Sequence, residues 1–162
     1  MNFITGKGIV TGLMALVFVA LFMILVVPQL QSMSDARRIS DVRAMSEAIS
    51  LYLKEGNTLS CIPGKVYRSF DKGNRIDGTG WVPIDFRKIS SGSPLKRLPF
   101  DPYTSESLAE PVYFYTFACD LVHNTYELNA RFEGKKFRKD AEQDGGNNPN
   151  VYEIGNDLTL IR

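Results

Sequence analysis

The chain has 162 residues, of which 44% are hydrophobic and 23% charged, and 19 lysines and arginines against 18 acidic residues give a formal net charge of +1. This near-neutral balance argues against nucleic-acid binding, which needs a strongly basic face to displace counterions. One histidine and two cysteines are too few for histidine-based catalysis, multi-ligand zinc sites or iron–sulfur clusters. We therefore expect a protein that is not an enzyme and has no such cofactor.

The first element is a long apolar segment close to the amino terminus. Residues 9–27 read IVTGLMALVFVALFMILVV and contain no ionisable side chain. As a helix this run would extend about 28 Å, which matches the hydrocarbon thickness of a bilayer. We predict a transmembrane helix over residues 9–28, preceded by a leader-like segment at 1–8. The alternative is a cleaved secretory signal peptide, whose apolar region is usually shorter, about 7 to 15 residues.

A second helical pattern follows Pro28 and continues to Gly56. Its apolar residues recur at spacings of three or four, which predicts an amphipathic helix over residues 29–56 with one buried stripe. The proline should kink the helix at the membrane boundary, although proline chemistry alone fits two separate helices equally well. We expect one long helix because no flexible linker follows. The stripe comprises Ile39, Val42, Met45, Ile49, Tyr52 and Leu53, and Asp35, Arg38, Asp41, Arg43 and Glu47 fill the positions between.

The remaining residues, 57–162, are expected to form the globular head. Turn signals dominate up to Pro102, and two β-favouring runs follow at residues 112–117 and 125–132. We predict that these runs pair as an antiparallel hairpin and that a third run, residues 158–161, adds an edge strand. The side chains expected to face the helix are those of Tyr126, Leu128, Ala130 and Phe132. The fold class is thus α+β, with a long N-terminal helix packed on a small antiparallel sheet.

The two cysteines, Cys61 just after the helix and Cys119 at the end of the first predicted strand, are placed for a disulfide. Two unpaired buried cysteines are the alternative. A disulfide persists only in an oxidising compartment, which favours an extracytoplasmic head. The positive-inside rule favours the opposite orientation, because Arg37, Arg38 and Arg43 lie beyond the apolar run.

Two residues that often mark active sites have structural interpretations here. Trp81, the sole tryptophan, is expected to pack in the core, and His123 is expected to lie exposed in the hairpin turn. The sequence also contains no phosphate-binding glycine motif. These features give no support to a catalytic centre.

Taken in order, these motifs resemble the type IV pilin and type II secretion pseudopilin family. The resemblance is carried by Lys7-Gly8 before the apolar run, Pro28-Gln29 near its end, the stretch of residues 35–42 in the continuing amphipathic helix, the turn at residues 98–102 and the carboxyl-terminal residues 144–160. It implies cleavage between Gly8 and Ile9 by a prepilin peptidase and methylation of the new amino terminus. It also implies assembly, by dedicated machinery, into a helical filament with copies of itself and other pilin-like subunits.

The assembly helix departs from the family pattern at one position. The family usually has a glutamate at the fifth residue after the cleavage site, and Leu13 stands there in this chain. Gly12 and Ala15 offer positions of close approach between packed helices, or they simply face lipid. A minor or tip subunit, a divergent filament subunit and an unprocessed membrane anchor all fit this departure.

An oxygen-rich segment near the carboxyl terminus, residues 140–153, suits calcium chemistry. It is similar to the calcium loop of major pseudopilins, and the residues expected to ligate are Asp144, Asn150 and Glu153. A solvated turn-rich loop is the alternative.

The sequence as a whole predicts a structural subunit of a pilus-like or pseudopilus filament, held in the inner membrane with an extracytoplasmic head or extracted into an extracellular filament. The alternative from another class is a membrane-anchored binding module that does not polymerise. An extracytoplasmic hydrolase would need converging polar groups that the sequence does not supply.

Overall fold

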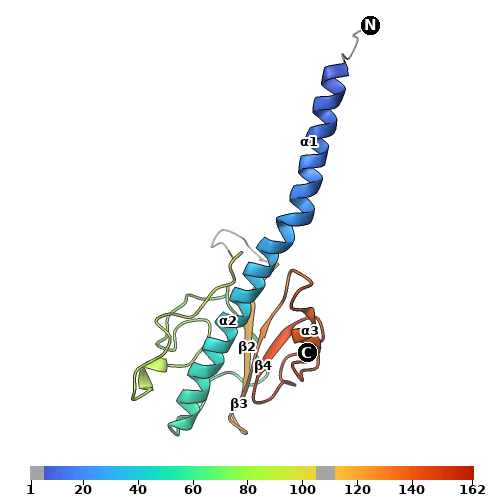
Figure 1. The fold of residues 1–162 in the computed structure, drawn as a ribbon. Helices are drawn as coiled ribbons and strands as arrows, with labels where there is room; N and C mark the ends of the chain where they lie inside the picture. Colours follow the sequence, from blue (N-terminus) through green and yellow to red (C-terminus); the bar gives the residue numbers. More distant parts are fainter. Residues whose placement is uncertain (1–5, 105–111) are drawn as a thin grey trace.

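The computed structural model describes residues 6–104 and 112–162 and has an α+β fold (Figure 1). Most of the predicted leader-like segment lies outside the described residues. The helical elements are α1 (Gly6–Leu25), α2 (Val27–Lys54), the 3-10 helix η1 (Phe86–Lys88) and α3 (Arg138–Glu142). The strands are β1 (Tyr67–Arg68), β2 (Tyr115–Asp120), β3 (Thr125–Ala130) and β4 (Tyr152–Gly155). The predicted combination of a long N-terminal helix with a small antiparallel sheet is confirmed.

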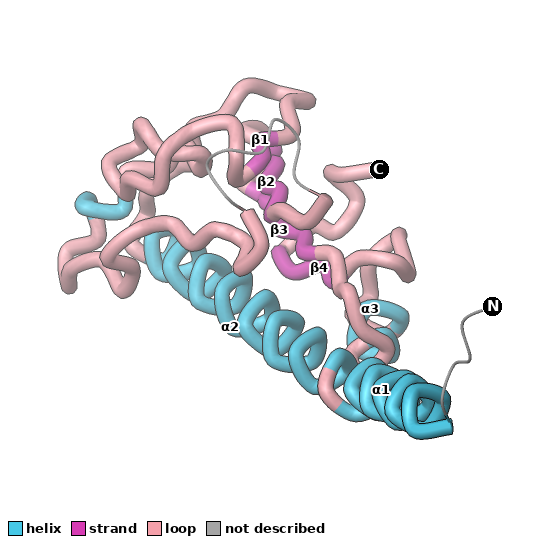
Figure 2. The backbone as a smooth tube through the Cα atoms, turned by 90° about the horizontal axis from the view of Figure 1, so that it is seen from above, coloured by secondary structure: helices cyan, strands magenta, loops and turns pink. Residues whose placement is uncertain are grey.

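The two long helices run end to end, and Figure 2 shows a change of direction between them. The helix is interrupted at Val26, and Pro28 lies in the first turn of α2. A proline is tolerated there because the first amides of a helix have no intrahelical acceptor. The other end matches the sequence prediction, since Gly56 adopts a left-handed conformation (φ 81°) just after α2.

The four strands form one antiparallel sheet in the order β1-β2-β3-β4. The predicted hairpin is present as β2 and β3, with Tyr115 opposite Ala130 and Asp120 opposite Thr125. The first strand of this hairpin therefore lies three residues later than the predicted start at residue 112.

The predicted edge strand at residues 158–161 is wrong. The fourth strand is β4, which pairs along β3 with Glu127 opposite Gly155. The backbone amides of Leu160 and Ile161 instead donate to Oε2 of Glu127, at 2.8 and 2.9 Å. A buried side-chain acceptor thus replaces strand pairing in this segment.

The core lies between α2 and the sheet and extends under the loops that connect α2 to β2. Trp81 is only 1% exposed and its indole N–H donates to the carbonyl of Pro99, so its predicted core role is confirmed. The face of β3 toward α2 carries Tyr126, Leu128 and Ala130, all buried, while Phe132 beyond the strand is partly buried against the same core. From α2 the core receives Ile39, Val42, Met45, Ala48, Ile49 and Tyr52.

Candidate functional site

The surface of α1 is the most unusual feature of the molecule, because its apolar side chains are not covered by the head. Every residue from Thr11 to Val26 is exposed. Leu16 is 68% exposed and Phe18 is 66% exposed. Over the described part of the chain, one helix is long and apolar enough to cross a membrane, and it begins near the amino terminus. A continuous apolar surface of this size requires lipid or other apolar helices around it.

The predicted processing and packing positions all fall on α1. Gly8 is exposed and the Gly8–Ile9 bond lies in the helix, while the side chain of Ile9 is outside the described atoms. A side chain added at Gly12 would meet nothing within 4 Å, and Ala15 is three residues further on the same exposed helix. Leu13, in the position of the family glutamate, is 63% exposed.

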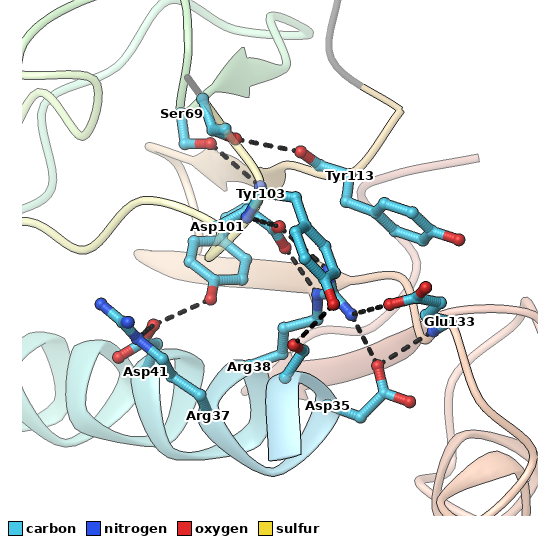
Figure 3. A network of polar contacts seen from close by, with 12 residues as sticks. Asp35, Arg37, Arg38, Asp41, Ser69, Asp101, Tyr103, Tyr113 and Glu133 are labelled. Carbon is cyan, nitrogen blue, oxygen red and sulfur yellow. Dashed lines mark hydrogen bonds and ion pairs between the residues drawn. The ribbon is translucent and has the colours of Figure 1, made fainter. Parts of the chain in front are cut away.

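A buried ionic cluster fixes the head to the beginning of α2 (Figure 3). The guanidinium of Arg38 is fully buried, and its Nε and Nη2 donate to the two carboxylate oxygens of Asp101 at 2.6 and 3.0 Å. Its Nη1 donates to Asp35 at 2.7 Å. Two charged acceptors and a bidentate contact satisfy the buried guanidinium, which would otherwise be very costly to desolvate.

The carboxylate of Asp35 connects this cluster to a second part of the head. It accepts hydrogen bonds from the backbone amides of Glu133 at 2.9 Å and Gly134 at 2.8 Å, in the segment that follows β3. Asp101 likewise accepts from the amide of Tyr103 at 2.9 Å. The loop before residue 104, the segment after β3 and α2 are therefore joined through Arg38.

The electrostatics of the cluster favour its ionised form. Burial opposes the charge of Arg38, yet hydrogen bonding and attraction from Asp101, followed by Asp35, raise the pKa of its guanidinium above the ordinary value. The aromatic rings of Tyr113 and Tyr103 lie 4.5 and 5.3 Å from the guanidinium carbon. Because Arg38, Asp35 and Asp101 are all paired, the arrangement is suited to holding structure.

One turn further along α2, Asp41 forms a second polar contact with the sheet. Its carboxylate accepts a hydrogen bond from the Tyr115 hydroxyl at 2.8 Å. Burial raises the pKa of Asp41 and also the pKa of Tyr115, which is raised further by the neighbouring Asp41 charge. Arg37 approaches Asp41 at 3.7 Å, but its side chain is 64% exposed.

The opposite face of the sheet is polar and buried. Glu127 and Asn129 on β3 and Glu153 on β4 point away from α2, because their neighbours Leu128 and Tyr152 face it. One side-chain oxygen on each of these three polar residues is buried without a hydrogen-bond partner. Such oxygens are acceptors that a cation or a water molecule would satisfy.

Of the three predicted calcium ligands, only Glu153 is buried on this face, and Asp144 lies next to it. Asp144 accepts from the backbone amide of Glu153 at 2.8 Å, so these two residues are adjacent. Asn150 is exposed. A side chain at Gly146 would collide with the Glu153 carboxylate, so the loop backbone lies directly against that group.

The oxygen-rich segment at residues 140–153, called the acidic loop below, ends at a carboxyl group with a raised pKa. Burial, together with the charges of Glu127 and Asp144, raises the pKa of Glu153 above its ordinary value of 4.5. Within the described ranges, no group of three or more histidine, cysteine, aspartate or glutamate side chains is spaced to hold a metal. Glu153 and Asp144 are adjacent, and Glu127 is a second buried carboxylate on the same sheet face, but the calcium assignment stays a prediction.

The predicted disulfide joins Cys61 to Cys119, residues 58 apart in the sequence. It ties the segment after α2 to the end of β2, as expected. His123 lies in the β2–β3 turn with its side chain 74% exposed, and its Nδ1 lies 2.5 Å from Asp120. This hydrogen bond raises the pKa of His123.

The residue set that sequence reasoning missed is the Arg38 cluster. The helical pattern placed Asp35 and Arg38 between the apolar stripe positions, yet both are fully buried. Their spacing of three residues on a helix was a signal for an ion pair. The third member, Asp101, belongs to a turn that the sequence identified, but no sequence pattern pairs it with residue 38.

Comparison of the chain with protein-family models, with curated protein sequences and with solved structures found no match in any of the three. The resemblance carried by the motifs therefore stays a prediction.

Proposed function

We propose that this protein is a structural subunit of a type IV pilus-like or type II secretion pseudopilus filament, anchored in a membrane before assembly through α1. The observation that carries the proposal is the exposure of every residue from Thr11 to Val26 on a helix that continues into a folded head. Lipid can cover this surface first, and the α1 helices of neighbouring subunits can cover it in a filament.

The architecture of the head supports a mechanical role for the helix. Arg38 joins α2 to one head segment through its buried ion pair with Asp101, and Asp35 joins α2 to a second through hydrogen bonds from backbone amides. Because α2 follows α1 end to end, these contacts connect the membrane-compatible helix to the head. Force applied to the helix would be transmitted to the head through this cluster. The expected partners are other copies of the chain, related subunits, a prepilin peptidase and an assembly machine.

Mass spectrometry of the native protein tests the processing step. The proposal predicts loss of residues 1–8 and a methylated Ile9, and it predicts that Gly8→Glu blocks the loss while Gly6→Ala does not. An intact Met1 in the native protein would contradict processing and favour the membrane-anchored binding module that does not polymerise.

Negative-stain microscopy of sheared surface material tests assembly directly. If α1 helices pack through small residues, Gly12→Ile should lower filament yield strongly, whereas Val17→Ile, which alters size without removing a close-approach position, should have little effect. Equal yields from both variants would contradict packing through Gly12.

Calcium belongs to the same proposal as a ligand of the acidic loop. Glu153 and Asp144 would supply carboxylate oxygens there, and the unpartnered buried oxygen of Glu127 lies on the same sheet face. A bound cation would neutralise charges that burial disfavours and would hold the loop against the sheet.

A further inference from the structure

A cluster of positive charge spans the end of the segment between β3 and α3 and the first two residues of α3. Lys135, Lys136, Arg138 and Lys139 occupy four of five consecutive positions, and all four are exposed. None of them forms an ion pair with a described residue, in contrast to Arg38 nearby. Lys136 instead lies 5.2 Å from the ring of Phe137. We call residues 135–139 the basic loop.

The basic loop is fixed at the end of the head from which α1 emerges (Figure 1). The two residues before it, Glu133 and Gly134, donate backbone hydrogen bonds to Asp35. Gln31 contributes a further contact, with its amide 3.4 Å from the Glu133 carboxylate. The loop therefore has a defined position along α2, set by residues 31–35.

Along α2, that position begins within the headgroup layer of a bilayer that contains α1 and ends a few ångströms beyond it. At a rise of about 1.5 Å per residue, Gln31 and Asp35 lie about 6 and 12 Å beyond Val27, where the apolar run ends. The headgroup region of a bilayer extends about 5 to 8 Å beyond the hydrocarbon on each side. Two apolar side chains at the same level, Leu30 and Met33, are 51% and 70% exposed and continue the lipid-facing surface.

Charge complementarity identifies the surface that the basic loop meets. Basic segments next to a membrane helix are attracted by anionic phospholipids over roughly one Debye length, about 8 to 10 Å. Glu133 is directed to α2, and Lys135 and Lys136 follow shortly after it, so these two lysines are held next to residues 31–35. Lys139 lies beside Arg43, further along α2.

We infer that the basic loop binds the headgroups of anionic phospholipids and seats the head on the membrane surface beside α1. The inference rests on the proposed membrane anchoring of α1 and adds a second, polar contact to it. Before assembly, the head would be held at one height and one rotation relative to the bilayer, because the residues directly before the loop are fixed to α2 through Asp35.

Hydrogen exchange of the full chain in lipid vesicles tests the inference. The protein is reconstituted in phosphatidylcholine alone and in a mixture of phosphatidylcholine and phosphatidylglycerol, and flotation verifies anchoring in both. We expect amide exchange across residues 135–142 to slow by about tenfold in the anionic vesicles, and high salt to reverse the effect. Exchange in η1, at the far end of α2, should be the same in both lipids.

A matched pair of variants locates the effect. Lys135→Gln, Lys136→Gln and Lys139→Gln together should abolish the lipid dependence. The control triple, Lys54→Gln, Lys65→Gln and Lys88→Gln, removes equal charge from exposed lysines and should keep the dependence.

Each contrary result has a distinct meaning. Failure of the wild-type protein to float with vesicles would contradict membrane anchoring and with it the proposed function. Anchoring without any dependence on lipid charge, or equal loss of the dependence in both triples, would overturn the inference alone. Equal slowing by short duplex DNA added to neutral vesicles would assign the loop to acidic polymers and also overturn it.

Discussion

The two halves of the long helix, α1 and α2, differ in what covers their apolar side chains. In α1 the apolar side chains face outward, and nothing described in the head covers them. In α2 the apolar stripe is buried against the sheet, and even Asp35 and Arg38 are enclosed. The apolar side chains of a helix need an apolar environment. In α2 the sheet of the same chain supplies it, whereas α1 is suited to lipid or to the helices of other subunits.

The largest predicted effect is the loss of stability when Arg38 is removed from its buried cluster on α2. Arg38→Ala should lower the free energy of unfolding by about 3 to 5 kcal/mol, because Asp35 and Asp101 remain as buried charges without their partner. Urea unfolding of the full chain in detergent, followed by the fluorescence of buried Trp81, measures this.

The neighbouring arginine supplies the control. Arg37 is exposed and lies 3.7 Å from Asp41, so Arg37→Ala should cost less than about 1 kcal/mol. Similar costs for the two adjacent substitutions would contradict a structural role for the buried cluster.

The disulfide separates the stability of the head from that of α1, because both of its cysteines lie in the head. Replacing Cys61 and Cys119 by serine opens a loop of 58 residues, and the chain-entropy model gives a loss of about 4 kcal/mol. The same urea titration should show the loss, while circular dichroism of the detergent-bound protein after unfolding of the head should still show the helical signal of α1. An unchanged midpoint would mean that the bond contributes nothing to the folded head.

A charge placed among the apolar residues of α1 should disfavour its insertion into a membrane. Leu16→Lys, near the middle of the apolar run, should disfavour membrane insertion by about 3 kcal/mol. Leu30→Lys provides the control, since its long side chain can reach the headgroup layer. The fraction of protein resistant to carbonate extraction measures insertion, and equal retention of both variants would contradict a membrane position for residue 16.

Sequence reasoning was most successful where one physical pattern decides the structure. Hydrophobic length predicted the membrane-compatible helix, and alternation in residues 125–132 predicted β3 and the face it buries. It failed where a side chain replaces the backbone as hydrogen-bond acceptor. Glu127 accepts hydrogen bonds from the amides of Leu160 and Ile161, so this β-favouring segment does not pair with a strand. The pairing of Arg38 with Asp101 could not be predicted either, because the two residues are 63 apart in the sequence and only the folded loop brings them together.

The smallest predicted effect concerns Glu153 and depends on pH. Burial raises its pKa in the folded protein, so the folded state binds its proton more tightly than the unfolded state, and stability falls as pH rises from about 4.5 through the raised value. Glu153→Gln removes that loss and should stabilise the calcium-free protein at neutral pH by about 1 kcal/mol.

If the loop binds calcium as proposed, added calcium should reverse the order of stability of the wild-type and Glu153→Gln proteins. With a cation at the loop, the charged carboxylate becomes a ligand, and wild-type stability should rise with calcium concentration while Glu153→Gln stays constant. The exposed neighbour variant Glu142→Gln should behave like wild type throughout. If calcium stabilises neither protein while Glu153→Gln remains the more stable at neutral pH, the buried carboxylate is an unfavourable charge of the sheet face and not a ligand.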